Sequence, residues 1–285
     1  MQKSTPSGMQ SIRVAKYRNG RLSDAADRLA VEEPLEIRIV FGPENARRRQ
    51  SLAVTMRTPG ADEELALGFL FTEAIIGNWQ QVQEIRRVDN RLAAEAVDNV
   101  IEVVLHPEVE FDAERLNRHF YTASSCGVCG KASLEMVRMV SCHFPQPGQP
   151  VIQAETLLKL PDQLRGNQSL FSDTGGIHAA GLFDESGRLL TVREDVGRHN
   201  ALDKAIGTAM RDGQMPLRKH IAVLSGRAGF ELVQKAAMAG IPVLVAVGAP
   251  SSLAVSLAEA EGITLVGFLR DGRFNLYTHQ ERILI

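Results

Sequence analysis

The residues of this sequence with the clearest capacity for chemistry are two cysteines two positions apart, Cys126 and Cys129. They lie in a run of small residues, 122–130, which predicts a loop that leaves both sulfur atoms accessible. A helix expected over residues 131–140 would direct backbone N–H groups toward that loop and favour thiolate. A thiol with a pKa of about 8.5 is only about 3% ionised at pH 7, whereas one near 6.5 is about three-quarters ionised. The pattern therefore indicates a nucleophilic sulfur site.

Three other interpretations of this cysteine pair stay open at the level of sequence. A dithiol–disulfide switch fits the spacing, although no thioredoxin-type βαβ pattern precedes it. A zinc site could take Cys142 and His143 as further ligands, although adjacent ligands are geometrically awkward and a second Cys-x-x-Cys is missing. The two side chains could also simply be buried, and we expect Cys142 to be a structural thiol at the end of an apolar helix.

The overall composition is that of a globular protein. The chain has 285 residues, 44% of them hydrophobic and 23% charged, which suits one large or two modest domains. Its net charge of −2 argues against a nucleic-acid-binding protein. Three cysteines are too few for a disulfide scaffold. No signal peptide is recognisable, and apolar stretches such as 241–249 are far shorter than the ~20 residues of a membrane helix. We expect a cytoplasmic protein that binds neither nucleic acid nor membranes.

The first part of the chain predicts a small α+β domain, assigned to residues 31–115. Residues 1–30 show no clear periodicity and are interpreted as a loose N-terminal tail or an irregular first strand. Apolar and polar residues alternate over 35–41, which is typical of a half-buried strand. The other expected elements are a partner strand at 52–56, a helix at 62–76, and strands at 84–88 and 100–105.

The second part, residues 116–285, predicts a layered α/β domain with the cysteine loop near its start. A helix is expected at 112–120 and a hairpin at 177–183 and 189–194. Helices expected at 199–211, 230–239 and 251–261 then alternate with apolar runs at 221–224, 243–247 and 263–268. Such alternation favours parallel strands, whose carboxyl ends are where ligands usually bind. Those ends carry residues 225–227, 248–250 and 270–273.

Glycines and charged residues gather near these strand ends. Paired glycines precede His178, which indicates either a ligand-facing histidine or a tight turn with a hydrogen-bonded histidine. Residues 193–200 hold five ionisable groups between a strand and a helix, and either bind a phosphate through Arg198 and His199 or form a salt-bridged strand end. With Arg227, Arg270 and Arg273 at other strand ends, the arrangement favours an anionic pocket.

Several common motifs are missing from the sequence. It contains no Rossmann fingerprint, Walker A loop, His-Glu-x-x-His or Gly-x-Ser-x-Gly. His178 does not begin the His-x-Glu of zinc deaminases, because Ala179 and Ala180 follow it.

Taken together, the motifs resemble those of the FdhD family, the formate dehydrogenase accessory sulfurtransferases, over about residues 31–279. The residues that carry the resemblance are 32–35, 57–60, 63–70, 126–131, 174–180, 193–200, 225–227 and 268–273. The resemblance implies a C-terminal domain with the cytidine-deaminase α/β fold but without its zinc chemistry, a smaller N-terminal domain, and a homodimer.

The resemblance also implies a function. Family members accept sulfur from a cysteine desulfurase and pass it to the molybdenum cofactor, bis-molybdopterin guanine dinucleotide, before its insertion into formate dehydrogenase. On this chain Cys126 would hold the persulfide and Cys129 would assist or relay. The expected cofactor site, which a guanine nucleotide could also occupy, is formed by Phe268, Leu269, Arg270, Asp271, Gly272 and Arg273. No protein-bound metal is expected. The alternative is a non-catalytic chaperone that binds the molybdenum cofactor.

Overall fold

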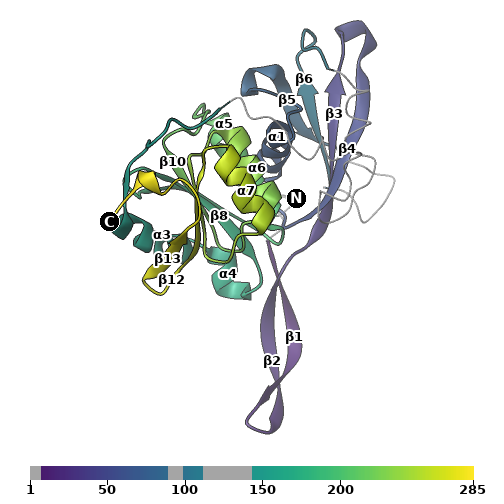
Figure 1. Cartoon of the computed structure of the whole chain (residues 1–285). Coiled ribbons are helices and arrows are strands. Elements are labelled where there is room, and N and C mark those ends of the chain that lie inside the picture. The colour runs from purple at the N-terminus through teal and green to yellow at the C-terminus, as the bar shows by residue number, and fades with distance from the viewer. Residues whose placement is uncertain (1–7, 89–98, 112–142) are drawn as a thin grey trace.

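The computed structural model describes residues 8–88, 99–111 and 143–285, which form a mixed α/β fold (Figure 1). The fold class predicted from the sequence is confirmed. Helices expected at 112–120 and 131–140, the cysteine loop with Cys126 and Cys129, and the zinc-ligand candidate Cys142 all lie outside the described residues. The expected boundary between residues 115 and 116 lies there too, so the division into two domains stays a prediction.

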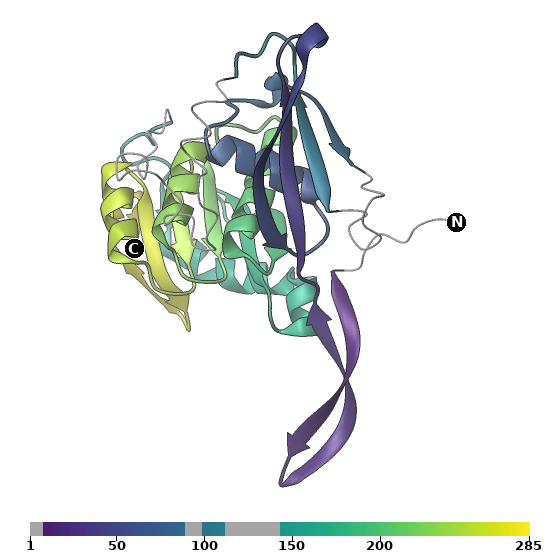
Figure 2. The ribbon, with the colours of Figure 1, turned by 90° about the vertical axis from the view of Figure 1, so that its right-hand side faces the viewer.

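The N-terminal segment is a regular two-stranded ribbon. Strands β1 (Met9–Arg18) and β2 (Arg21–Ala30) pair antiparallel along their whole length. They extend away from the rest of the molecule in both views (Figures 1 and 2). Asn19 and Gly20 both have positive φ, as a type I′ hairpin turn requires. The prediction of a loose tail is therefore wrong for residues 9–30. Most of the ribbon is solvent-exposed, so it shows no hydrophobic alternation, and the Asn-Gly pair was the signal available.

A four-stranded sheet follows, in the order β4-β3-β6-β5. Its strands are β3 (Glu33–Phe41), β4 (Arg48–Arg57), β5 (Val82–Arg87) and β6 (Val100–Leu105). The alternation in β3 places Leu35, Ile37 and Ile39 on the core face, where helix α1 (Asp62–Thr72) packs. The short 3-10 helices η1 (Glu44–Ala46) and η2 (Trp79–Gln81) lie in the connections. Helix α1 ends four residues before the predicted position, and the chain turns at Ala74, which has positive φ.

The larger sheet has six strands in the order β13-β12-β11-β10-β8-β9. The central strands β10, β11 and β12 are parallel, as predicted, and the other three pair antiparallel. Its strands are β8 (His178–Asp184), β9 (Leu189–Asp195), β10 (His220–Leu224), β11 (Val243–Ala246), β12 (Thr264–Arg270) and β13 (Arg273–Leu276).

Helices cover both faces of this sheet. On one face lie α5 (Arg198–Arg211), α6 (Phe230–Ala239) and α7 (Ser252–Ala260), each within two residues of its predicted start and end. On the other lies α3 (Ala154–Gly166), which the sequence does not predict because Pro161 lies inside it. The remaining elements are the short helix α4 (Ser169–Thr174), the strands β7 (Ile152–Gln153) and β14 (Ile283–Leu284), which pair, and η5 (Gln280–Arg282).

The two sheets share one hydrophobic core through the contact of α1 with α5. The same cluster of buried side chains includes Leu35 and Ile101 of the smaller sheet and Ala222 and Leu244 of the larger one. Figure 1 shows α1 lying between the smaller sheet and the helices of the larger one. The smaller sheet is therefore fixed relative to the strands whose ends form the candidate site.

Candidate functional site at the strand ends

The carboxyl ends of β10, β11 and β12 meet at one edge of the large sheet, because the three strands are parallel. The loops that follow them are joined by backbone hydrogen bonds. Gly248 N donates to Gly226 O over 3.0 Å, and Phe268 N donates to Gly248 O over 3.1 Å. Ala228 and Pro250 form a further bridge. We call this edge, formed by residues 225–227, 248–250 and 267–268, the strand-end site. The sequence predicted that 225–227 and 248–250 lie together, and the structure confirms it. The third predicted segment was 270–273, but β12 continues to Arg270, so residues 267–268 lie beside the other two loops instead.

Phe268 has a strained backbone conformation in this site. Its φ is +55°, and the pairing of β12 with β13 shifts register between Gly267 and Arg270. The neighbouring Gly267 has no room for a side chain, since a Cβ there would lie 2.8 Å from Pro250 Cδ. Bulges and unusual φ values of this kind re-aim a side chain and gather at binding sites.

The tip of the β12–β13 hairpin presents two arginines to each other. Asp271 and Gly272 both have positive φ, which makes a two-residue turn, and the register places Arg270 directly opposite Arg273. Like charges at opposite positions of a hairpin are destabilising, and a bound anion would relieve their repulsion. Leu269 differs from its neighbours, because its side chain is only 1% exposed and belongs to the core. Of the six residues expected to bind the cofactor, Leu269 can therefore contribute only its backbone.

Two histidines lie beside the strand-end site. A Cβ at Gly226 would lie 3.2 Å from His178 Nδ1, and His199 Nε2 lies 3.1 Å from Glu231 Oε2. Burial lowers the pKa of His178. The nearby Arg198 guanidinium lowers it further, whereas the Asp195 carboxylate raises it by a smaller amount. Burial also lowers the pKa of His199 to about 3, with contributions from Lys235, Arg198 and His178. Both imidazoles are therefore neutral at pH 7, and the uncharged His199 ring can donate Nε2–H to the Glu231 carboxylate.

The charged segment 193–200 contains carboxylates that hold the fold together and basic residues that lie near His178. The buried Asp195 accepts from Gly197 N over 2.8 Å and pairs with Lys204 Nζ at 2.7 Å. Glu194 accepts from the backbone N–H groups of Leu170 and Phe171, in the first turn of α4. The structural interpretation is therefore confirmed for Asp195 and Glu194. Arg198 and His199 begin α5 close to His178, and phosphate binding by these two residues stays a prediction.

The burial of His199 makes a testable contribution to acid stability. Its pKa in the folded chain, about 3, lies below the ordinary value of 6.5, so the unfolded chain binds a proton that the folded chain does not. Stability is therefore lost as pH falls from 6.5 toward 3. We expect His199→Gln to lose less stability than the wild type between pH 7 and pH 4, measured as urea midpoints, with His106→Gln as the control. Parallel pH profiles of wild type and His199→Gln would contradict this.

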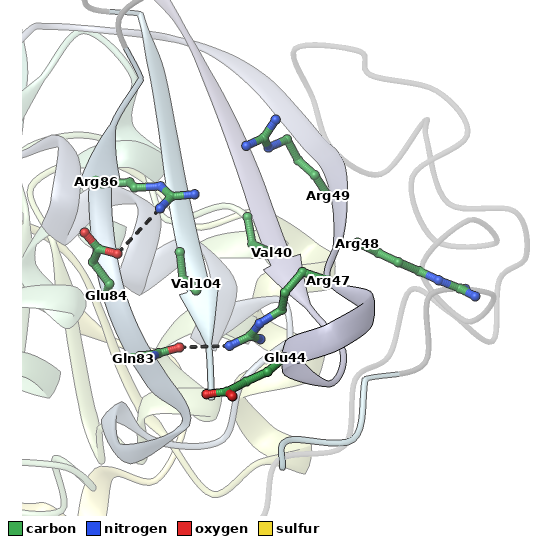
Figure 3. A pocket seen from close by; sticks show the side chains of 9 residues that line it. All are labelled: Val40, Glu44, Arg47, Arg48, Arg49, Gln83, Glu84, Arg86 and Val104. Carbon is green, nitrogen blue, oxygen red and sulfur yellow. Dashed lines mark hydrogen bonds and ion pairs between the residues drawn. The ribbon is translucent and has the colours of Figure 1, made fainter. Parts of the chain in front are cut away.

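A second hollow, of about 670 Å³, lies on the small sheet and is lined by Arg47, Arg48, Arg49 and Arg86 (Figure 3). Most of these cations already have partners on this chain. Arg86 Nη2 lies 3.0 Å from the buried carboxylate of Glu102, which also pairs with Arg49. Arg47 donates to Gln83 Oε1 over 2.9 Å and to the carbonyl of Leu105. Arg49 and Arg86 thus neutralise a buried carboxylate, and Arg47 is held by neutral acceptors, so these three side chains already have acceptors within the chain.

Within the described ranges, no group of three or more His, Cys, Asp or Glu side chains could hold a metal ion. In the same residues, no helix is both long enough and apolar enough to span a membrane.

Four similarities relate the chain to known proteins. The FdhD/NarQ family model matches residues 30–284. A Mycobacterium tuberculosis protein named "Sulfur carrier protein FdhD" is 51% identical over 259 residues, covering 90% of this chain and 91% of the relative. A protein of the same name from Saccharolobus solfataricus is 40% identical over 277 residues, covering 95% and 99%. The crystal structure of a formate dehydrogenase accessory protein from Desulfotalea psychrophila superposes with a TM-score of 0.73 at 24% identity, covering 98% of this chain and all of that one. This last match bears on the fold alone.

Proposed function

Because this chain belongs to the FdhD/NarQ family, we propose that it is a sulfur carrier that serves formate dehydrogenase. The named relatives support sulfur carriage, and service to formate dehydrogenase is part of the proposal. The proposal further assigns the sulfur to a persulfide on Cys126, a cysteine desulfurase as its donor, and the molybdenum cofactor as its acceptor. A homodimer is part of the same proposal.

The loading step exchanges one sulfur–sulfur bond for another. The Cys126 thiolate attacks the outer sulfur of the persulfide on the desulfurase. A sulfur–sulfur bond forms at Cys126 while the donor's bond breaks, and the desulfurase cysteine leaves as a thiolate. No net oxidation occurs, and Cys126 then carries the sulfur as a persulfide.

Release of the sulfur as sulfide needs two electrons, which Cys129 can supply. Its thiolate attacks the inner sulfur of the Cys126 persulfide, so that hydrosulfide leaves and a Cys126–Cys129 disulfide forms. A cellular dithiol then reduces this disulfide for the next cycle. The spacing of the two cysteines suits this exchange, and the step gives Cys129 a role distinct from that of Cys126.

The arginines at and beside the strand-end site are the observation that carries the cofactor part of the proposal. Arg270 and Arg273 lie opposite each other at the exposed tip of the β12–β13 hairpin, and Arg227 follows β10, which is separated from β12 by β11. Guanidinium groups bind phosphate oxygens in a bidentate manner, and a guanine dinucleotide carries a pyrophosphate. The residues present therefore fit an anionic nucleotide as the cargo of this site.

The sulfur carriage is tested by loading the protein in vitro. After incubation with a cysteine desulfurase and cysteine, we expect mass spectrometry to find one added sulfur atom on the peptide that contains Cys126. Treatment with dithiothreitol should remove it. A peptide that stays unmodified, while the desulfurase carries its own persulfide, would overturn the sulfur assignment.

The cofactor site predicts the effect of removing its arginines. Each charge-assisted hydrogen bond contributes about 1.5–3 kcal/mol, so we expect Arg270→Ala and Arg273→Ala each to weaken GDP binding by roughly 10–100-fold. Isothermal titration calorimetry measures the affinity. Arg188→Ala, at the turn between β8 and β9, serves as the control and should bind GDP as the wild type does. Equal GDP affinities in all three variants would show that the hairpin is not part of the nucleotide site.

A further inference from the structure

The ribbon formed by β1 and β2 has no part in the function proposed above, although it extends well away from the core (Figures 1 and 2). Each strand has 10 residues, which corresponds to a length of about 33 Å. Every residue from 15 to 24 is exposed. A two-stranded ribbon that packs against nothing else is only marginally stable in water. Within the part of the chain that the structure describes, the outer half of the ribbon therefore lacks a packing partner.

The base of the ribbon, in contrast, is fixed to the body of the molecule. Arg28 of β2 forms an ion pair with Asp173 of α4. Phe171, also on α4, lines one hollow together with Ser225 of the strand-end site. In Figure 1 the ribbon and the β12–β13 hairpin both lie toward the lower end of the molecule. The ribbon therefore projects from the edge of the molecule that carries the strand-end site.

The tip of the ribbon, residues 16–22, has different chemistry on its two faces. Tyr17 lies opposite Leu22, and these two residues are 73% and 71% exposed. The next pair, Arg18 opposite Arg21, lies on the other face beside the two-residue turn. Tyrosine and arginine are among the residues most enriched at the centres of protein interfaces. The ribbon tip thus presents an apolar pair and a cationic pair back to back.

The cationic pair is not neutralised by the described part of the chain. The third cation of the ribbon tip, Lys16, pairs with Asp27 at 3.2 Å, but no described carboxylate forms an ion pair with Arg18 or Arg21. Like charges at opposite positions of a ribbon repel each other. Carboxylates supplied by another molecule would remove this repulsion, and the same molecule could bury the apolar pair.

A protein surface fits the ribbon tip better than the other surfaces that a cation could meet. Recognition of anionic lipid uses clusters of roughly four to eight lysines or arginines, whereas this tip has three, of which Lys16 is already paired. The net charge of −2 disfavours nucleic acid. On a second copy of the chain, the hollow of the small sheet would repel the tip, because arginines line it.

We propose that the ribbon tip is a docking arm for formate dehydrogenase and enters a cleft that has one apolar wall and one wall with carboxylates. Tyr17 and Leu22 contact the apolar wall, and Arg18 and Arg21 pair with the carboxylates. The inference rests on the proposed function, which supplies the identity of this partner. The position of the ribbon favours the enzyme that receives the cargo over the sulfur donor, because a protein bound to the ribbon lies beside the site where the cargo would be held.

Charge reversal at the ribbon tip provides the first test. Formate dehydrogenase from cells that lack this protein is titrated against the wild type and against Arg18→Glu/Arg21→Glu by biolayer interferometry. We expect the reversal to weaken binding about 100-fold or more, because it brings like charges together. Wild-type binding should weaken as salt is added. The matched control is Arg218→Glu/Lys219→Glu, which reverses two exposed cations at the amino end of β10 and should bind as the wild type does.

The apolar pair provides an independent variant. Tyr17→Ser/Leu22→Ser keeps every charge, so we expect it to weaken binding about tenfold or more and to leave the salt dependence unchanged. Melting temperatures confirm that each variant is folded. If neither double variant changes the affinity for formate dehydrogenase, the proposal is overturned.

Three further measurements separate this partner from the alternatives. They are flotation with vesicles of phosphatidylcholine and phosphatidylserine, sedimentation velocity, and the rate at which a cysteine desulfurase loads sulfur. We expect all three to be the same for the wild type and the tip variants. If one of them changes while the affinity for formate dehydrogenase does not, the tip binds a membrane, a second copy or the sulfur donor, and the proposal is overturned.

Loading of Cys126 separates this inference from the function on which it rests. If wild-type Cys126 is never loaded but the binding of formate dehydrogenase depends on the ribbon tip, the sulfur function fails and the docking arm stands. If Cys126 is loaded but the tip variants bind formate dehydrogenase as the wild type does, the docking arm fails alone.

Discussion

Replacing Cys126 by alanine is expected to abolish the ability of this protein to support formate dehydrogenase. Alanine has no sulfur that could attack the donor persulfide or hold the transferred atom, so no slower route through this residue remains. The measurement is formate dehydrogenase activity in cells that lack their own copy of the protein and express the variant. We expect activity no higher than in cells with no copy at all.

The other two cysteines supply the comparison for that experiment. Cys129→Ala should still accept sulfur on Cys126 but release it slowly, because the second thiolate that forms the disulfide is missing. Cys142→Ala should behave like the wild type, since no step uses that thiol. If Cys126→Ala keeps full activity while Arg270→Ala and Arg273→Ala lose it, the chain is the non-catalytic cofactor-binding chaperone instead.

Adding a methyl group at Gly68 or Gly207 is expected to cause the largest loss of stability. A Cβ at Gly68 would lie 1.9 Å from the carbonyl oxygen of Asp203, and one at Gly207 would lie 1.9 Å from that of Glu64. Both neighbours are helix backbone, which cannot move without separating α1 from α5. Overpacking in cores typically costs 1–3 kcal/mol, and a clash with backbone belongs at or above the upper end, about 3 kcal/mol.

Thermal unfolding measures this effect. With about 2–4 °C per kcal/mol for chains of this size, we expect Gly68→Ala and Gly207→Ala each to lower the melting temperature by roughly 6–12 °C. Gly166→Ala, at the end of α3, is the matched helical control, because a Cβ there meets nothing within 4 Å. It should be neutral or slightly stabilising. A melting temperature unchanged in Gly68→Ala would contradict the close approach of the two helices.

The periodic elements of this fold could be predicted from the sequence. Strand β6 and helix α6 have the predicted residues, and α5 and α7 begin and end within two residues of theirs. Each of these elements has a buried face, so the spacing of its hydrophobic residues predicts whether it is a helix or a strand. The ribbon of β1 and β2 and the helix α3 were missed for opposite reasons. The ribbon buries few side chains and so shows no hydrophobic pattern, whereas α3 has Pro161 in its interior, a residue that usually ends a helix.

Part of the site could be predicted from the sequence. Segments 225–227 and 248–250 follow predicted parallel strands, and a backbone hydrogen bond joins them at one edge of the sheet. The third segment was predicted at 270–273, but β12 continues to Arg270, so residues 267–268 take that place and 270–273 form a hairpin tip. The positive φ of Phe268 and the bulge beside it leave no pattern in the sequence from which this could be predicted.

By itself, the sequence determined the cysteine pair, the parallel strands and the loops that end them, because residue type and spacing depend only on the order of the chain. The tertiary structure decided which charges are structural. The carboxylates of Asp195 and Glu194 are bound by Lys204 and by the backbone of α4, whereas Arg270 and Arg273 lie opposite each other. It also decided that Leu269 belongs to the core. These properties depend on what packs around a side chain, and burial is a property of the whole chain rather than of any motif.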